Sequence, residues 1–561
     1  MPVSPRWPVS AAIAIVVGGA LLFAPSLGAD FVWDDRPLIV DDMRLRTFAG
    51  VVESITGDFF NWASDAGGYG YWRPTVTLSY ALQRAIFGPS ALAFHLFNVL
   101  AHALIMGLGF TLGLRRGLNP VGLLLGLVAF ALMPSHVEAV SWVSGRTDLL
   151  AAIAVLGVLL VDGEEREGWG KPALMAGLML AAVTSKELAV VTPVLAVLIN
   201  GGRQSLVRIA SFVAPIFVWA AVRATLVAVR PSDGPPETAL EWLATVPAAI
   251  ELYVRGLLGF SAPLAYRSLR PVVDWGRMGM WSGLTLVLGG LAVGLRWPRV
   301  GRWLLAGALC LLPALNIVRV AAPVDMGFPV SDRFAYIPSL FWALGIGHLL
   351  AELTEGRAKL RLGLGVALLP LFCFMGVVLW QAQAVWANDA AFFAGTNARN
   401  PGRPLIEIQM VEALRRDGQL EAAQREGERI ARRHLDAGED MPGALRLTLL
   451  AVASVGKSPS TVQRLWREHI KAIPEPNAVD WLNLGLAEDR AGDYAAAEVA
   501  FVQAVKERAE FIPAWVGLGL VRVKRGNLLG ARAALDSGRV HDPQHPGLQQ
   551  LDELITRAET P

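Results

Sequence analysis

The sequence predicts an all-α protein, a polytopic bundle of membrane-spanning helices followed by a C-terminal helical repeat solenoid. Two observations about composition support the membrane part. Of the 561 residues, 54% are hydrophobic and 17% are charged, whereas soluble globular chains carry about 25% charged residues. The mean hydropathy is +0.45. A third observation is a sharp fall in hydrophobic density near Trp386, after which the chain is rich in Glu, Arg and Ala with helical periodicity.

The same composition excludes several classes of protein. A chain this apolar is neither disordered nor collagen-like, and it is no disulfide-rich scaffold. The net charge of +2 gives no electrostatic reason to expect nucleic acid as a partner. Both cysteines, Cys310 and Cys373, lie in apolar runs, so we expect neither a disulfide framework nor a zinc site.

Residues 1–385 form the predicted transmembrane domain. A spanning helix needs about 20 mostly apolar residues, and about 11 runs approach that length. A further run, residues 242–260, contains Glu251 and Arg255 and is expected to be an interfacial or re-entrant helix. The expected spans are residues 9–27, 91–114, 121–134, 149–161, 172–184, 188–199, 209–229, 281–295, 303–318, 336–353 and 362–381.

Basic residues in the short loops predict the orientation. They share the cytoplasmic side if the N-terminus is cytoplasmic, and the first long loop, residues 30–90, then faces outward with everything after residue 381. The first run is expected to be an uncleaved helix rather than a signal peptide, because more spans follow. The basic residues are Arg115, Arg116, Arg166, Lys171, Arg203, Arg208, Arg296, Arg299, Arg302, Arg357, Lys359 and Arg361.

Residues 386–561 contain internal repeats. Trp481 and Gly492 recur as Trp515 and Gly526, at an offset of 34 residues that matches the tetratricopeptide (TPR) period. Clear repeats cover residues 478–545, and divergent helical pairs cover residues 400–475, with one pair in 409–430 and another in 445–473. Such solenoids create concave faces, which favour a bound peptide or protein over a mere spacer.

The first outer loop opens with Asp34 and Asp35 directly after the first span. Paired carboxylates near the hydrocarbon edge are costly unless they are solvated, paired or used, and aromatic residues flank this pair. An ionised aspartate there could act as a general base on a hydroxyl. The alternative is a solvated loop, which is the expected role of Asp41 and Asp42. The pair allows chemistry with or without a divalent cation such as Mg²⁺ or Mn²⁺.

Other polar residues fall at the same predicted membrane face. Arg73 could bind an anion. His95, Asn98 and His102 share one face of a helix and should point into the bundle, where an interhelical hydrogen bond is an equal alternative to a functional role. Two histidines without a third ligand make a weak metal site. Later outer segments contribute His136, Glu138, Arg146, Asp148, Lys186, Glu187, Asp332, Arg333 and Tyr336, and their convergence is better evidence than any one cluster.

Together these motifs resemble the TMTC (transmembrane and tetratricopeptide repeat) O-mannosyltransferase family and its bacterial relatives. The order of membrane half and repeats is similar too. The chain departs from the family in its small number of repeats and in Asp332, where Glu is expected. The motifs are Phe31-Val-Trp-Asp34-Asp35, Tyr71-Trp-Arg73-Pro74, Phe94-His95-Leu-Phe-Asn98, His136-Val-Glu138, Gly145-Arg146-Thr-Asp148, Ser185-Lys186-Glu187 and Asp332-Arg333-Phe-Ala-Tyr336.

The resemblance implies a GT-C glycosyltransferase that uses a polyprenyl-phosphate sugar. It implies that Asp34 or Asp35 is the catalytic acid or base. Cations on the outer face would stabilise the departing lipid phosphate, and the candidates are Arg73, Arg146, Lys186 and Arg333. The remaining polar residues would support the site: His95, Asn98, His102, His136, Glu138, Asp148, Glu187, Asp332 and Tyr336.

The leading hypothesis is therefore transfer of one sugar, with mannose as the candidate, to a Ser or Thr hydroxyl of an exported protein. Transfer to a lipid or envelope glycan is an alternative, and so is a non-enzymatic, membrane-anchored TPR assembly factor. A transporter is disfavoured because the membrane half shows no internal duplication. The Ala-, Gly- and Arg-rich composition suggests a bacterial inner membrane with periplasmic repeats. The sequence does not fix the sugar, the acceptor, the lipid length, the metal dependence or the oligomeric state.

Overall fold

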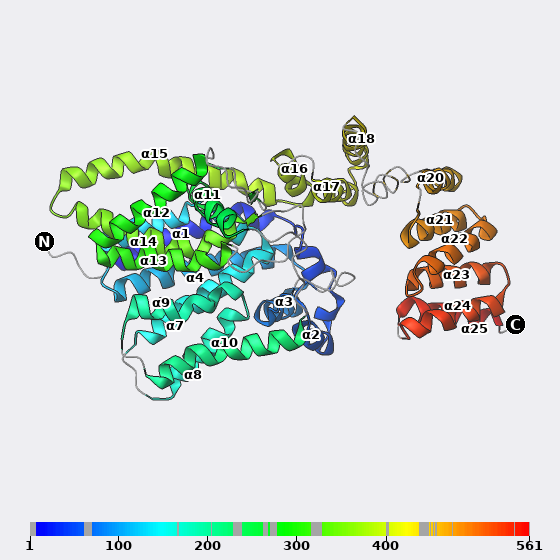
Figure 1. Cartoon of the computed structure of the whole chain (residues 1–561), viewed down its shortest axis with the longest axis horizontal. Helices are drawn as coiled ribbons and strands as arrows, with labels where there is room; N and C mark the ends of the chain where they lie inside the picture. Colours follow the sequence, from blue (N-terminus) through cyan, green and yellow to red (C-terminus); the bar gives the residue numbers. More distant parts are fainter. Residues whose placement is uncertain are drawn as a thin grey trace. The chain divides into compact units, whose positions relative to one another are not determined.

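The structure, a computed structural model, describes residues 7–60, 70–164, 168–202, 205–227, 238–261, 267–269, 278–315, 328–399, 403–436, 448, 450, 452, 454, 457–473, 475–543 and 545–559. The chain forms two compact units, Met1–Thr396 and Asn397–Pro561. Each unit is described by itself (Figure 1). The domain limits of 1–385 and 386–561 remain a sequence-based prediction.

The first unit is a helical bundle, as the sequence predicts. Among the described residues its only strands are β1 (Arg267–Leu269) and β2 (Phe328–Val330), which pair antiparallel. Its helices are α1 (Trp7–Leu21), α2 (Phe48–Ile55), α3 (Pro74–Phe87), α4 (Ala91–Arg115), α5 (Pro120–Ala131), α6 (His136–Val140), α7 (Arg146–Asp162), α8 (Gly170–Val183), α9 (Thr192–Asn200), α10 (Leu206–Leu226), α11 (Ala239–Leu257), α12 (Met278–Arg296), α13 (Pro298–Leu311), α14 (Tyr336–Leu353), α15 (Ala358–Ala382) and α16 (Asp389–Arg399).

Seven helical segments of this unit are long and apolar enough to cross a membrane, so the expected count of about 11 is not confirmed. The other four expected spans form α5, α8, α9 and α13, which have only 9 to 14 residues and fall short of a full span. The seven are Pro8–Gly28, Ala91–Arg115, Val143–Asp162, Leu206–Leu226, Met278–Arg296, Asp332–Leu353 and Ala358–Trp386.

Small residues hold the centre of the bundle together. A Cβ atom on Gly122 of α5 would lie 2.5 Å from the carbonyl oxygen of Gly347 in α14, and one on Gly126 would lie 2.5 Å from that of Ala343. Close backbone approach of this kind is typical of helix pairs in membranes. It holds α14, which begins at Tyr336, against the helix that precedes His136.

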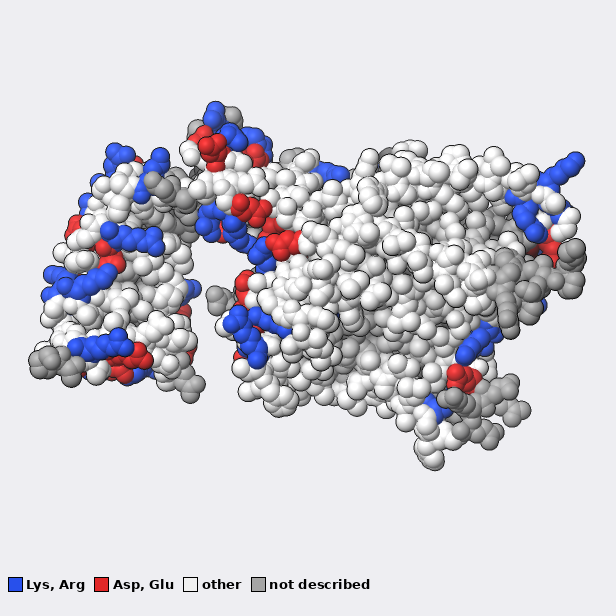
Figure 2. Space-filling view, turned by 180° about the vertical axis from the view of Figure 1, so that it is seen from behind, with Lys and Arg blue, Asp and Glu red and all other residues white. Residues whose placement is uncertain are grey.

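The outer surface of the unit is apolar. Leucines such as Leu104, Leu291 and Leu362 are exposed. Figure 2 shows a wide surface of this unit without Lys, Arg, Asp or Glu, and charged side chains gather toward its ends. A wide apolar surface of this kind on a folded chain is expected to face lipid. Together with the seven candidate spans, it indicates that the first unit belongs to an integral membrane protein.

The second unit is the predicted TPR solenoid. Phe501 packs between the repeats, because a Cβ atom on either Gly485 or Gly517 would lie 2.6 Å from its ring. The turn glycines Gly492 and Gly526 have φ angles of 81° and 76°, which glycine adopts without strain. The helices are α17 (Pro404–Arg416), α18 (Leu420–Asp436), α20 (Pro459–Ala472), α21 (Ala478–Arg490), α22 (Tyr494–Glu507), α23 (Ile512–Lys524), α24 (Leu528–His541) and α25 (Pro546–Glu559).

Helices also lie where the sequence predicts the divergent pairs. Helices α17 and α18 form the pair expected in residues 409–430 and turn at Gly418, whose φ angle is 73°. Helix α20 is the second helix of the pair expected in residues 445–473. Most of its expected partner lies outside the described residues.

Candidate active site

A tight turn after the first span presents the two aspartates in different directions. The amide of Asp35 donates to the carbonyl of Val32 at 3.1 Å. Trp33, inside the turn, has a φ angle of 55° and is the only described non-glycine residue with a positive φ. A bulky residue in this conformation costs about 1–3 kcal/mol and persists only where its surroundings enforce it.

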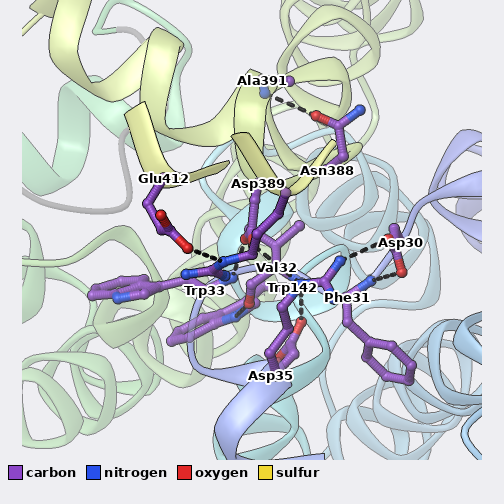
Figure 3. Close-up of polar contacts among 12 residues, drawn as sticks. Asp30, Phe31, Val32, Trp33, Asp35, Trp142, Asn388, Asp389, Ala391 and Glu412 are labelled. Carbon is purple, nitrogen blue, oxygen red and sulfur yellow. Dashed lines mark hydrogen bonds and ion pairs between the residues drawn. The ribbon is translucent and has the colours of Figure 1, made fainter. Parts of the chain in front are cut away.

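The contacts of Trp33 with its neighbours hold it in this conformation (Figure 3). Its amide donates to Oδ1 of Asp389 at 2.7 Å. Its ring stacks against Trp142 and Phe392, each with a centroid distance of 5.5 Å. The other oxygen of Asp389 accepts from Nε of Arg36 at 3.1 Å. Sequence reasoning assigned no role to Asp389, which lies in the region that we attributed to the repeats.

Asp35 is a structural residue in this arrangement. Its Oδ1 accepts from the amide of Ser144 at 2.8 Å and from the Ser144 hydroxyl at 2.5 Å, and its Oδ2 accepts from the amide of Val32 at 3.0 Å. The side chain is fully buried. Burial raises the pKa of Asp35 to about 7, although the hydrogen bonds from Ser144 and Val32 oppose that rise. Asp35 therefore ties the first outer loop to the segment that begins α7.

Asp34 has no such partners. It is 8% exposed, and its carboxylate makes no hydrogen bond or ion pair with the part of the chain that the structure describes. Burial raises the pKa of Asp34 to about 7, while the nearby charges of Arg333 and Arg73 hold it down. A carboxylate with unused oxygens and a pKa near neutrality has the properties of a general base.

Three ion pairs connect the outer segments named above, and two of them contain Arg73 and Arg333, whose charges act on Asp34. Arg73 donates to Glu187 through Nη2 at 2.9 Å and through Nε at 3.2 Å. Lys186 pairs with Asp148, and Arg333 pairs with Glu138. The chain thus brings Arg73, Lys186 and Arg333 together, three of the four cations that the sequence singles out.

Burial perturbs two members of these pairs. It lowers the pKa of Lys186 to about 8, against the opposing charge of Asp148. It raises the pKa of Glu138 to about 7, against the charge of Arg333. Perturbed groups that cluster beside a free acid are typical of a functional site.

Aromatic rings line the same cluster. Arg73 lies over the ring of Tyr71 at 4.5 Å, Lys186 lies over Phe334 at 4.7 Å, and Arg333 lies over Trp142 at 5.1 Å. Cations held over rings are only partly solvated. A bound anion at this position would therefore face cations that have already lost much of their water.

The fourth predicted cation, Arg146, occupies a different environment. It is fully buried and donates to Asn98 Oδ1 at 3.2 Å and to the Phe94 carbonyl at 3.2 Å. Asn98 in turn donates to the carbonyls of Val140, Trp142 and Val143. Arg146 and Asn98 therefore position the segment that carries Ser144, the partner of Asp35. The predicted contact of Arg146 with a donor phosphate remains a prediction.

His102 and His136 make interhelical contacts, whereas His95 contacts the loop after the first span. For His102 this contact is the equal alternative that the sequence leaves. His102 Nδ1 lies 2.6 Å from the Tyr336 hydroxyl, His136 Nε2 lies 3.0 Å from the Ser339 hydroxyl, and His95 Nε2 lies 3.3 Å from the Asp30 carbonyl. Asp332 is buried where α14 begins. Among the described residues no three His, Cys, Asp or Glu side chains gather as a metal site would require.

A small apolar cavity begins beside the ion pairs. Its volume is about 10 Å³, which holds one water molecule, and its lining includes Asp148, Leu188, Cys310, Phe334 and Ile337. The lining thus combines the carboxylate that pairs with Lys186 and mostly apolar side chains.

The fold and the site together define a class of protein, an integral membrane protein with a buried free acid beside paired cations and a TPR solenoid in the same chain. No protein-family profile matches the chain. Its similarity to individual proteins is nevertheless clear, and it confirms the resemblance to the TMTC family.

The chain is 31% identical over 175 residues to protein O-mannosyl-transferase Tmtc1 of Drosophila melanogaster, which covers 30% of this chain and 20% of that protein. It is 36% identical over 155 residues to TMTC2 of Mus musculus (26% of this chain, 18% of that protein) and 32% identical over 164 residues to TMTC4 of Homo sapiens (25% and 22%). The chain thus matches about a fifth of the length of these relatives.

Among solved structures, the chain is similar at 14% identity to one described as the APC/C hetero-tetramer Cut9–Hcn1, with a TM-score of 0.26 over 87% of this chain and 93% of that one. A likeness at this level adds nothing to the description of the fold given above.

Proposed function

We propose that this protein is a membrane glycosyltransferase that moves a sugar from a polyprenyl-phosphate donor to a protein hydroxyl. The observation that carries the proposal is the unpaired carboxylate of Asp34 beside Arg73 and Arg333. The names of the relatives, protein O-mannosyl-transferases, support glycosyl transfer to protein and make mannose the first sugar to test.

In the proposed reaction Asp34 acts as the general base. Its carboxylate accepts the proton of the acceptor hydroxyl while the hydroxyl oxygen forms a bond to C1 of the sugar. The bond between C1 and the phosphate oxygen breaks, and its electron pair leaves with the lipid phosphate. The proton on Asp34 then returns to solvent. A base placed in this way typically contributes 10²- to 10⁴-fold to the rate.

The cations would stabilise the leaving phosphate. Arg73, Lys186 and Arg333 are held in place by Glu187, Asp148 and Glu138 before any substrate binds. Charged donors fixed in advance toward a developing negative charge are the commonest large contribution to catalysis. Arg146 would act differently, as a positioning residue behind Asp35.

The donor lipid would lie along the apolar cavity that begins at Asp148, with its phosphate at Lys186. The cavity holds only one water molecule, so binding would require the lining around Leu188, Phe334 and Ile337 to separate. No step of this proposal needs a metal ion. Whether Mg²⁺ or Mn²⁺ assists the leaving group is an additional question for the assay below.

The solenoid would recruit the acceptor, a protein with Ser or Thr hydroxyls on the side of the membrane that Asp34 faces. We place that side in the bacterial periplasm, with the N-terminus in the cytoplasm, because the basic residues of the short loops favour this orientation. Transfer to an envelope glycan remains the second candidate, because the described repeats are few for a dedicated protein receptor.

The test measures donor consumption by the purified full chain in proteoliposomes. Radiolabelled polyprenyl-phosphate mannose and polyprenyl-phosphate glucose are supplied separately, with a cell extract as the source of acceptors and with or without EDTA. Asp34→Asn should lower the rate at least about 100-fold, whereas Asp41→Asn, which changes an exposed aspartate of the same loop, should leave the rate unchanged. Failure to consume either donor would favour the assembly-factor hypothesis.

A further inference from the structure

A second cavity lies at the other end of the membrane-spanning unit, away from Asp34. Its volume is about 270 Å³, and its lining includes Arg115, Arg116, Arg299 and Arg302 together with Asn200 and Trp303. We call it the four-arginine pocket. A cavity of this size is close to the lower limit of ligand sites, about 300 Å³.

The course of the helices separates this pocket from the candidate active site. Helix α4 has 25 residues and is therefore about 37 Å long. His95, near its first residue, contacts the carbonyl of Asp30 beside the aspartate turn, whereas Arg115 and Arg116 lie at its last. Helix α9 likewise ends at Asn200 in the pocket, and it follows the segment that carries Lys186.

Three of the four arginines of the pocket lack acidic partners in the described chain. In the described ranges, Arg116, Arg299 and Arg302 make no ion pair. Arg115 meets Glu164 at 3.4 Å, and both side chains are partly exposed. The Nε and Nη2 atoms of Arg116 are buried with no hydrogen-bond partner in the described chain.

The acids nearby are already occupied. Asp162 accepts from Arg208 at 2.7 Å and from Asn200 at 2.7 Å. Glu352 lies 3.1 Å from His348. This pair is near the pocket, because the charge of Arg299 acts on His348. The pocket therefore combines a cavity, several cations and buried donors without acceptors, whereas a simple orientation signal in the loops would need only the charges.

These features fit a phosphate group. Each guanidinium presents a planar fork of donors that matches two phosphate oxygens, and buried donors need acceptors. Helix α13, which contributes Arg299, Arg302 and Trp303 to the pocket, carries the exposed Leu305. Helix α12 packs against α13 and carries the exposed Leu291 and Leu295. Acyl chains would therefore find an apolar surface near the pocket. Basic pockets between spanning helices at the membrane edge are suited to anionic head groups.

We propose that the four-arginine pocket binds the phosphate group of an anionic lipid at the membrane edge opposite Asp34. Free phosphate carries the same chemistry and is the other source to be distinguished. This inference does not depend on the glycosyltransferase proposal, because it concerns a different pocket and a different membrane face.

The test uses the full chain purified in a non-ionic detergent. Native mass spectrometry counts the retained phosphatidylglycerol and phosphatidylcholine, and the melting temperature is followed with phosphatidylglycerol or with millimolar inorganic phosphate. Arg299→Gln/Arg302→Gln should retain phosphatidylglycerol about tenfold less than wild type, and each single substitution about threefold less. The control Arg296→Gln/Arg357→Gln removes the same charge outside the pocket and should change retention less than twofold.

Retention of phosphatidylglycerol over phosphatidylcholine, lost only in the pocket variants, supports the lipid phosphate. Stabilisation by inorganic phosphate alone, also lost only in the pocket variants, supports a free phosphate and overturns the lipid as the source. Equal retention by wild type and the pocket variants overturns the site altogether, and so does an equal loss in the control. The single substitutions keep the test decisive if the double variant does not fold.

Discussion

The two ends of the membrane-spanning unit differ in whether their positively charged side chains are paired with carboxylates. Around Asp34, each of Arg73, Lys186 and Arg333 is paired with a carboxylate from a different segment. In the four-arginine pocket, Arg299 and Arg302 have no such partner in the described chain. The first arrangement fixes cations in place while the site is empty. The second is complete only when an anion from outside the chain is present.

Because of this difference, removing a charged side chain should change the stability of the protein in opposite directions at the two ends. Removing an acid from a buried pair leaves an uncompensated charge, which is costly. Removing a cation from a group of unpaired cations relieves repulsion instead. Removing an acid from an ion pair at the Asp34 end should therefore lower the stability of the protein. Removing an arginine from the four-arginine pocket should raise it slightly.

The largest effect should follow Asp148→Asn. The Lys186–Asp148 pair is the most buried of the three, with side-chain exposures of 4% and 2%. Loss of the acid leaves Lys186 unpaired, and the free energy of unfolding should fall by about 3–5 kcal/mol. Thermal unfolding of the purified chain measures the loss.

Glu53→Gln is the matched control for that substitution. Glu53 meets Arg44 at 3.8 Å with its side chain 68% exposed, so its loss should cost less than about 1 kcal/mol. Equal effects of the two substitutions would show that the pairs at the Asp34 end are not held in a low-dielectric site.

The pH dependence comes next in size. Because burial raises the pKa of Asp34 to about 7, the folded state holds its proton more tightly than the unfolded state does. The contribution of Asp34 to stability is then greatest below the usual aspartate pKa of about 4 and is lost as pH rises through 7. Transfer needs the ionised base, so its rate should rise about tenfold between pH 6 and pH 7.5.

A pH series on wild type and Asp34→Asn tests the predicted fall in stability and the predicted rise in transfer rate. The variant should lose the fall in stability over pH 4–7 that Asp34 causes, while the fall that belongs to Asp35, whose pKa is also raised to about 7, remains. A transfer rate that falls between pH 6 and pH 7.5 would contradict the role of Asp34 as a base.

The smallest effect should come from Arg299→Gln/Arg302→Gln in detergent without anionic lipid. Relief of repulsion should raise the free energy of unfolding by about 0.5–1 kcal/mol. Added phosphatidylglycerol should stabilise wild type and leave the variant unchanged. A large destabilisation of the lipid-free variant would mean that these arginines have partners within the chain.

Much of the fold can be predicted from the sequence, because the repeat period and the hydropathy pattern depend on residues that are close together in the chain. The repeats from Trp481 to Leu535 were placed by their 34-residue offset and formed α21 to α24. The expected count of about 11 spans is not confirmed, because apolar runs such as residues 188–199 hold short helices bounded by proline or glycine. Hydropathy alone cannot distinguish such a helix from a full span.

For the site, the sequence predicts which residues belong to it but not what each residue does. Motif order predicts Asp34, Asp35 and the cations as site residues, yet nothing in two adjacent aspartates shows which one faces Ser144. That distinction comes from the φ angle of Trp33 and its contact with Asp389, 356 residues later. Long-range contacts of this kind leave no periodic signal in a single sequence, and they separate Arg146 from the other cations too.

The most direct test of the account compares Asp34→Asn with Asp35→Asn, measuring transfer rate and melting temperature on the same samples. Asp34→Asn should lower the rate at least about 100-fold without lowering the melting temperature. Asp35→Asn should lower the free energy of unfolding by about 1–3 kcal/mol, because a buried hydrogen-bond network loses an acceptor. A folded Asp34→Asn protein that transfers sugar at the wild-type rate would contradict the account.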